Sequence, residues 1–177
     1  MFGFRRRSEP SATPHAEVLP MTKVKKDLDA YLSKVQDIGK RRKRQVLELA
    51  LQTVAGQGKL DVFCTSLLRM DIVGMTRPRA IELALFLHGR AHAIIERERR
   101  TSMGIKHATW RYSGAGCFNN PTNPAQMKQD AAHRAAHGKR YDNIKGLLIN
   151  GKRTWPGMDE GCKCISISEI PGLSVLG

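Results

Sequence analysis

Apolar residues recur at helical spacing in the first half of the chain. Five of them stand at intervals of four, three, four and three residues: Val24, Leu28, Tyr31, Val35 and Ile38. This spacing places the side chains on one face of an amphipathic or coiled-coil-like helix. We expect this helix to begin near Thr22 and to continue through "RQVLELALQTVAGQG", where Gly56 and Gly58 end it.

Two further helices are predicted before Gly104. The segment "LDVFCTSLLRMD" places its apolar residues on one helical face, and Cys64 lies among them, so we expect Cys64 to belong to the core. The second segment, 76–104, opens with Thr76, a residue type that caps helices, and with Pro78, which suits a first turn. The helical pattern stops at Gly104.

The pattern changes after Gly104. "IKHATWRY" and "CKCISISEI" alternate as strands, "AQMKQDAAHRAAHG" is typical of a short helix, and Asn150-Gly151 between two apolar-containing runs predicts a hairpin. The predicted fold class is therefore α+β, with two or three N-terminal helices followed by a small module of a short helix and β-hairpins. We expect a flexible basic arm over 1–20, a helical region over 21–104, and the α+β module with its His/Cys cluster over 105–177.

Length and composition favour one compact domain with an extended arm. The chain has 177 residues, of which 41% are hydrophobic, which suffices for a core. Charged residues and histidines interrupt the longest apolar run, "AIELALFLHGRAHAII", so we expect no membrane span and no membrane partner. The first twenty residues contain no apolar stretch of signal-peptide length, so no export signal is expected.

The chain is strongly basic. Its 30 Lys and Arg against 16 Asp and Glu give a net charge of +14, which indicates a polyanionic partner such as nucleic acid. Two runs supply much of the charge, and they are the candidate binding residues: Arg5, Arg6, Arg7, and Lys40, Arg41, Arg42, Lys43, Arg44. A charge run can also be no more than a solvated helix face.

Cysteine and histidine are the residue types in this chain that suit a metal site. We expect the thiols to stay reduced, as they would in a cytosolic chain of this kind. A bridge between Cys162 and Cys164 is disfavoured, since side chains two residues apart on a strand point the same way. His88 and His92 stand four residues apart on a predicted helix, but no acidic or thiol residue completes a set there, so we interpret them as structural.

Four features follow one another in the last seventy residues: a Trp-bearing strand, "DAAHRAAHGKRYD", a hairpin ending in "WPG", and "GCKC". Together they resemble the C-terminal signature of the phage Mu F-like minor head proteins, also called head morphogenesis proteins. That signature has a helix rich in Arg, Ala and Glu before a strand, a His followed by Gly-Lys, and a proline-led turn into Cys-basic-Cys. Here the elements are "RAHAIIERERRTSMGIKHATW", His133 with Gly138 and Lys139, and Pro156 with Cys162, Lys163 and Cys164. The resemblance covers about residues 50 to 170.

Two thiols at Cys162 and Cys164 would share one face of an expected strand, and together with a nearby imidazole they suit a metal site in the C-terminal module. His133 holds the family's histidine position and would join Cys162 and Cys164 as a ligand of a structural Zn²⁺, a metal that prefers thiolate and imidazole. The fourth ligand could be Cys117, Asp130 or His137, and Cys117 is the one that we include in the candidate set. A module with so little core would gain stability from the metal. In the alternative, His133 hydrogen-bonds a turn and the thiols only pack.

A catalytic interpretation uses some of the same residues. His133, His137 and Asn143 could be read as a histidine-metal nuclease centre that acts on phosphodiesters. Nucleases of that type usually take an acidic ligand from the hairpin, and "GLLINGKRTW" contains none. We therefore expect no enzymatic activity.

The resemblance further implies a virion component, a minor head protein that is assembled in the host cytoplasm. Its partners would be the portal protein, the major capsid protein and the phage genome. With no base-reading motif in the chain, contact with DNA would be independent of sequence, and the two basic runs would bind DNA or the portal. A free nucleic-acid-binding regulatory protein with a zinc-stabilised C-terminal module is the alternative.

Overall fold

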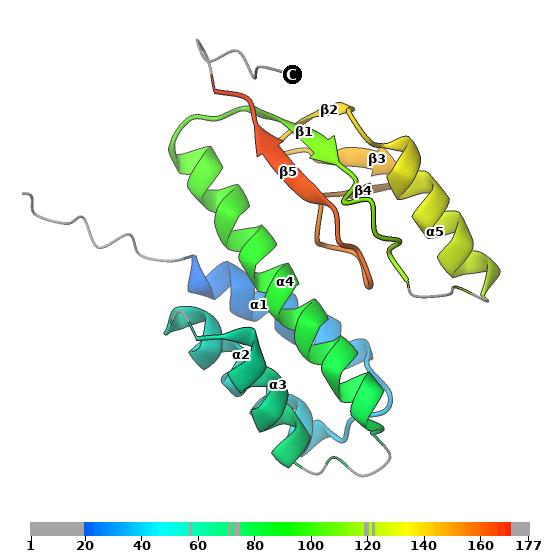
Figure 1. Ribbon diagram of the computed structural model, residues 1–177. Helices are drawn as coiled ribbons and strands as arrows, with labels where there is room; N and C mark the ends of the chain where they lie inside the picture. Colours follow the sequence, from blue (N-terminus) through cyan, green and yellow to red (C-terminus); the bar gives the residue numbers. More distant parts are fainter. Residues whose placement is uncertain are drawn as a thin grey trace, which may run out of the picture.

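The computed structural model describes residues 20–56, 58–70, 72, 75–118, 121 and 123–170, and its fold is α+β (Figure 1). The first half contains α1 (Met21–Lys34), α2 (Lys40–Ala55), α3 (Leu60–Arg69) and α4 (Arg77–Ser102). The second half contains β1 (His107–Arg111), α5 (Pro124–Ala135), β2 (Arg140–Asp142), β3 (Leu147–Ile149), β4 (Lys152–Thr154) and β5 (Ile165–Ser168). The predicted fold class is confirmed. The predicted arm, with Arg5, Arg6 and Arg7, lies outside the described residues.

The long predicted helix of the first half is wrong, because the chain breaks it into α1 and α2. Val35 and Ile38 are both buried, and Gly39 takes an extended conformation before α2 begins. The break lets α2 fold back, so that Val46 and Ala50 become fully buried in the core that α1 lines. A continuous helix would carry α2 away from α1 and leave both apolar faces in water. This break also raises the number of N-terminal helices from two or three to four.

α4 is the central helix and begins as predicted. The side chain of Thr76 accepts the backbone N–H of Arg79 at 3.4 Å, and a proline stands in the first turn. Ala84, Leu87 and Ala91 are fully buried, and α4 packs against the other three N-terminal helices. No helix in the described part of the chain combines the length and the apolar character that a membrane crossing needs.

Two small antiparallel sheets form the C-terminal module. The order in the first is β2-β1-β5, and the second is the β3-β4 hairpin. The predicted hairpin at Asn150-Gly151 is confirmed, and both residues take positive φ angles, 49° and 77°, as a tight two-residue turn requires. Ala108 and Trp110 of β1 are fully buried on the inner face of the first sheet.

The turn between β4 and β5 docks the module onto the helices. Met158 is buried in the same core as the helices, and its carbonyl accepts a hydrogen bond from Arg90 of α4, which also holds Asp27 of α1. The guanidinium of Arg97 lies 4.3 Å from the ring centroid of Trp155. The residues from Trp155 to Cys164 therefore connect the helices to the sheets.

Candidate metal centre

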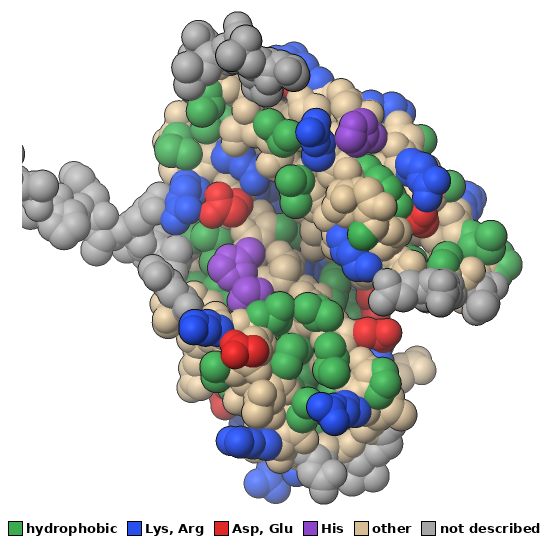
Figure 2. Space-filling model, viewed as in Figure 1, with side chains coloured by type: hydrophobic (Ala, Val, Ile, Leu, Met, Phe, Trp, Pro, Cys, Tyr) green, Lys and Arg blue, Asp and Glu red, His purple; other side chains and the backbone are tan. Residues whose placement is uncertain are grey.

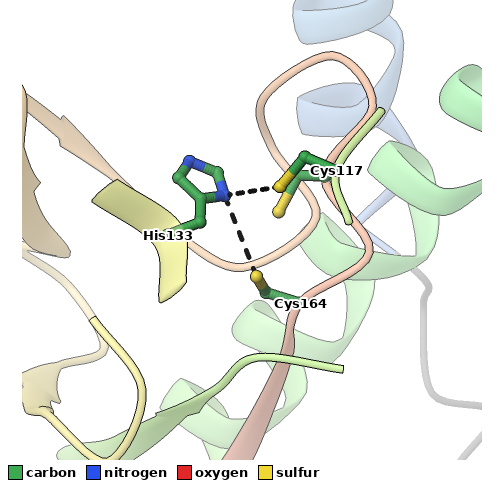
Figure 3. Close-up of side chains that lie close together, drawn as sticks. Cys117, His133 and Cys164 are labelled. Carbon is green, nitrogen blue, oxygen red and sulfur yellow. Dashed lines mark hydrogen bonds between the residues drawn. The ribbon is translucent and has the colours of Figure 1, made fainter. Parts of the chain in front are cut away.

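Three thiols and one imidazole converge in the C-terminal module. Cys117 comes from the loop after β1, His133 from α5, and Cys162 and Cys164 from the turn before β5; their ligand atoms all lie within 4.8 Å of one another. The sulfurs of Cys117 and Cys164 lie 3.4 and 3.8 Å from Nδ1 of His133. Figure 3 shows this nitrogen facing the two sulfurs while the other ring nitrogen points away. The four residues form a group that is compatible with a metal ion.

The imidazole of His133 is held rigidly. Asn123 caps α5 by accepting the N–H of Ala125 at 2.8 Å, and His133 stands on the buried face near the other end of the helix. Its side chain is 1% exposed and meets the ring of Trp110 edge-on, with centroids 5.2 Å apart. Packing against Trp110 fixes the ring plane, so the ring cannot turn away from the sulfurs.

Asp159 contacts the other side of the imidazole. Its Oδ2 lies 3.5 Å from Nε2 of His133 and accepts the hydroxyl of Thr154 at 2.7 Å, while Lys152 donates to Oδ1 at 3.0 Å. Burial opposes the charge of this carboxylate, but the hydrogen bonds from His133, Thr154 and Lys152 outweigh it and lower the pKa of Asp159 to about 2. In the neutral ring, a carboxylate at Nε2 favours the tautomer that carries its proton there, and the lone pair is then on Nδ1, where a metal would bind.

Asp130 and His137 do not join the centre. Asp130 accepts the backbone N–H of Cys117 at 2.6 Å and the hydroxyl of Tyr112 at 2.9 Å, so it positions the loop that carries Cys117. His137 is exposed, and its Nδ1 accepts the N–H of Tyr112 at 3.2 Å. Of the three candidates for a fourth position, the structure brings Cys117 to the cluster.

Cys162 and Cys164 do not lie on a strand, contrary to the sequence expectation. The N–H of Cys162 donates to the carbonyl of Asp159 in a turn, and β5 starts only at Ile165. Close packing explains the glycine in this turn, since a Cβ on Gly161 would lie 2.5 Å from the carbonyl oxygen of Cys117. The chain must bend to bring both sulfurs to Cys117, and a strand ladder cannot bend so sharply.

The pKa values of two thiols in the cluster shift in opposite directions. Hydrogen bonds from Cys117 and Cys164 lower the pKa of Cys162, and the same contact with Cys162 raises the pKa of Cys117. The N–H of Gly157 donates to the Cys162 sulfur at 3.3 Å and supports a thiolate there. Burial disfavours a charged His133, but the hydrogen bonds to Asp159 and to the sulfurs outweigh it and raise its pKa to about 11. The cluster thus favours an ionised sulfur at Cys162, the form of cysteine that binds metals.

The three residues of the nuclease interpretation do not share one site. Asn143 is 1% exposed, and its side chain donates to the carbonyl of Ile105 at 2.7 Å, which ties the turn after β2 to the start of β1. Its own carbonyl accepts the indole N–H of Trp155 at 2.9 Å. His137 is on the surface, while His133 faces sulfur. Asn143 therefore has a structural role in the module.

The second basic run lies at the start of α2. Arg42 donates to Gln45 at 3.1 Å and Lys43 to the carbonyl of Ser33 at 3.1 Å. Three of the five residues are exposed: Lys40, Arg41 and Arg44. Nothing in the described residues tests what this run binds.

The remaining Cys and His residues lie outside the cluster. Cys64 was predicted to belong to the core. It packs against the core of the helices but is only partly buried. The rings of His88 and His92 meet at an angle of 52° with centroids 4.4 Å apart, and no metal-ligand group of the described residues includes them.

Sequence reasoning missed Asp159 as a partner of the centre. The one signal was an acidic residue inside the cysteine-bearing turn, but only the folded chain places it against His133. Comparisons with protein-family models, with curated proteins and with solved structures give no match to this chain. What can be said of the four residues of the centre therefore depends on their distances, burial and hydrogen bonds.

Proposed function

We propose that the protein is a structural component of a phage head, and that one zinc ion holds its C-terminal module together. The convergence of Cys117, His133, Cys162 and Cys164 is the observation that carries the zinc site. The resemblance to the minor head proteins and the net charge of +14 support the place in the virion. The two parts of the proposal have separate tests.

The donor set and its dimensions suit zinc. Bonds of about 2.3 Å to sulfur and about 2.0 Å to nitrogen put neighbouring ligand atoms of a tetrahedron about 3.5–3.8 Å apart. The distances from His133 Nδ1 to the sulfurs of Cys117 and Cys164, 3.4 and 3.8 Å, are close to this. Four protein ligands leave no open position for substrate, which is typical of structural rather than catalytic zinc.

A metal would strengthen a weak part of the fold. The apolar cluster at the centre of the module is small, and its buried members are Ala108, Trp110, Ala136, Tyr141, Ile149 and Cys164. Zinc would cross-link the three segments that carry the ligands: the loop after β1, α5, and the turn before β5. Bound zinc contributes directly to the folding free energy of small modules.

Metal analysis with thiol titration tests the zinc site. We expect one zinc per chain and one reactive thiol, Cys64, in the native protein, with all four reactive after denaturation in a chelator. Cys164→Ser should lose the metal, whereas the matched control Cys64→Ser should keep it. Protein purified without chelator that contains no zinc and takes up none would favour the alternative, in which the thiols only pack.

The basic run of α2 is the proposed DNA contact. The first turn of α2 contains no acidic residue, and its N-terminal end carries Lys40, Arg41 and Arg44 in water. Cations at this end oppose the helix dipole, so an anion nearby would relieve their mutual repulsion. Packaged DNA offers phosphates at high density, and each contact gains free energy by releasing condensed counterions.

Salt-dependent binding to random-sequence duplex DNA tests this interface. The affinity for DNA falls as salt rises, so the slope of log affinity against log salt is negative. Replacing Lys40, Arg41 and Arg44 by Gln should make this slope less steep by about one for each phosphate that the chain no longer binds, about three in total. The control replaces three exposed basic residues of the module: Lys106, Arg111 and Lys145. An unchanged slope in the α2 variant would assign its charges to solvation or to a protein partner.

Purified phage particles test the place in the virion. We expect the chain to copurify with portal and major capsid protein at a low, fixed copy number per particle. A chain that is absent from particles but binds nucleic acid in the lysate would instead be the free regulatory protein.

A further inference from the structure

β5 is an open edge of the first sheet. Among the described elements only β1 forms a ladder with β5, and Figure 1 shows no strand on its other side. The N–H of Glu169 donates to His107 of β1, so the antiparallel alternation turns the N–H and C=O of Ser166 and Ser168 toward the open edge. Proteins usually protect such an edge with proline or charge, but Ile165–Ser168 contains neither.

The outer face of β5 carries exposed apolar residues. The register pairs Ile165 with Arg111 and Ile167 with Thr109, which places the isoleucines on the face away from Trp110. Ile165 is 56% exposed and Ile167 half-buried. Figure 2 shows hydrophobic side chains beside basic ones over this part of the surface. Isoleucine favours the strand conformation by itself, but its exposed apolar surface is stabilised only when a partner covers it.

The charges that flank β5 are self-complementary. Lys163 precedes the strand and Glu169 follows it, each three residues from Ser166. Arg140 donates to Glu169 at 2.6 Å and Thr109 donates to it at 3.1 Å, which holds this carboxylate at the outer face. An antiparallel second copy of the segment runs in the opposite direction. Its Glu169 therefore lies opposite Lys163 of the first copy, and its Lys163 lies opposite Glu169 of the first copy.

We propose that β5 pairs with β5 of a second copy of this chain, antiparallel about a two-fold axis through Ser166. The N–H of each Ser166 then donates to the carbonyl of the other, and the two sheets join into one of six strands. In this register Ile165 faces Ile167 of the second copy on one side of the sheet. The pairing is isologous and closed, so it stops at a dimer.

Other registers do not fit as well. A shift by one residue would put isoleucine opposite serine and turn the two outer faces to opposite sides. A shift by two would keep the faces but separate Lys163 from Glu169 of the second copy. The register centred on Ser166 is the one that satisfies edge hydrogen bonds, apolar pairs and charges together.

Sedimentation equilibrium of the full chain tests the dimer. We expect dimers at micromolar concentrations, weakened about tenfold or more by Ser166→Pro, which removes the edge N–H in both copies without touching the ladder to β1. The control Ser166→Ala keeps the N–H while removing the hydroxyl that contacts Tyr141, and should still dimerise. Unchanged circular dichroism and metal content would show that the proline variant is folded.

Charge reversal and cross-linking test the register. Lys163→Glu should weaken the dimer because it places like charges opposite each other, whereas Lys128→Glu on α5 should not. In a mixture of isotopically light and heavy protein, a carbodiimide should link Lys163 of one copy to Glu169 of the other. A chain that stays monomeric, or a dimer that Ser166→Pro leaves intact, would overturn the proposal.

Discussion

The two ring nitrogens of His133 face different partners. Nδ1 faces the sulfurs of Cys117 and Cys164, and Nε2 faces the carboxylate of Asp159. This pairing of a carboxylate with a metal-binding histidine orients the ring and makes it a better electron donor. At the level of single residues, the chemistry of the centre therefore depends on a residue that offers no ligand atom to the cluster.

We expect Asp159→Asn to weaken zinc binding by about 10- to 100-fold, because the neutral amide stabilises the oriented imidazole poorly. Competition with a chromogenic chelator measures this change. Asp61→Asn, an exposed carboxylate of α3, is the control and should leave the affinity unchanged. Equal affinity in the two variants would mean that Asp159 supports only the hairpin, through Thr154 and Lys152.

At the level of helices and strands, the turns decide where the ligands lie. The β3-β4 hairpin places Thr154 and Lys152 against Asp159, and the hairpin depends on the positive φ angles of Asn150 and Gly151. Gly89 of α4 is different, because it lies within a helix and a Cβ added there would meet no neighbouring group within 4 Å. Glycine is required in the hairpin and only permitted in the helix.

Gly151→Ala should therefore destabilise the protein by about 1–2 kcal/mol, because a Cβ opposes a left-handed backbone. Gly89→Ala should stabilise it by about 0.5–1 kcal/mol, since alanine loses less backbone entropy in a helix. Urea unfolding followed by circular dichroism measures both changes. Two shifts of the same sign would contradict this account.

In the molecule as a whole, arginines of α4 connect the helices to the module. Arg90 donates hydrogen bonds to the carboxylate of Asp27 in α1 and to the backbone carbonyl of Met158. Arg79 forms ion pairs with Asp37 at 3.1 Å and with Glu160 at 2.9 Å. The same turn carries Asp159 and the two cysteines of the centre. The docking of the two halves and the geometry of the candidate metal centre are therefore linked through one short segment.

We expect Arg90→Gln to destabilise the protein by about 2 kcal/mol or more, because glutamine cannot bind both carboxylate and carbonyl and leaves half-buried groups unpaired. Thermal unfolding measures the loss. Arg69→Gln changes an exposed arginine of α3 and should be close to neutral. A neutral Arg90→Gln would show that apolar packing alone docks the module.

Zinc removal should loosen the module and leave most of the helices intact. Both tryptophans, Trp110 and Trp155, lie in the module, whereas α1 to α4 have their own core. A strong chelator should shift tryptophan emission to longer wavelength while most of the helical circular dichroism persists, and added zinc should reverse the shift. Simultaneous loss of both signals would contradict a local role for the metal.

Local pattern was enough to predict most elements. The caps and spacing of α4, the Asn-Gly hairpin and the alternation of β1 each depend on residues near one another in the chain, so their local preferences act before any tertiary contact forms. The break after α1 could not be predicted in this way. The apolar spacing through Val35 and Ile38 is helical, and only packing against α2 and α4 makes the bend favourable.

Composition and short-range periodicity specify the fold class and the basic character, and the resemblance to the minor head proteins indicated His133 with Cys162 and Cys164, so these could be predicted before folding was considered. The folded chain was needed to show that Cys117, rather than Asp130 or His137, lies with His133 and that Asp159 orients the ring. Contacts between segments that are far apart in the chain depend on the directions in which the turns orient those segments. Gly161 allows the turn before β5 to approach Cys117, and no local pattern encodes the contact that results.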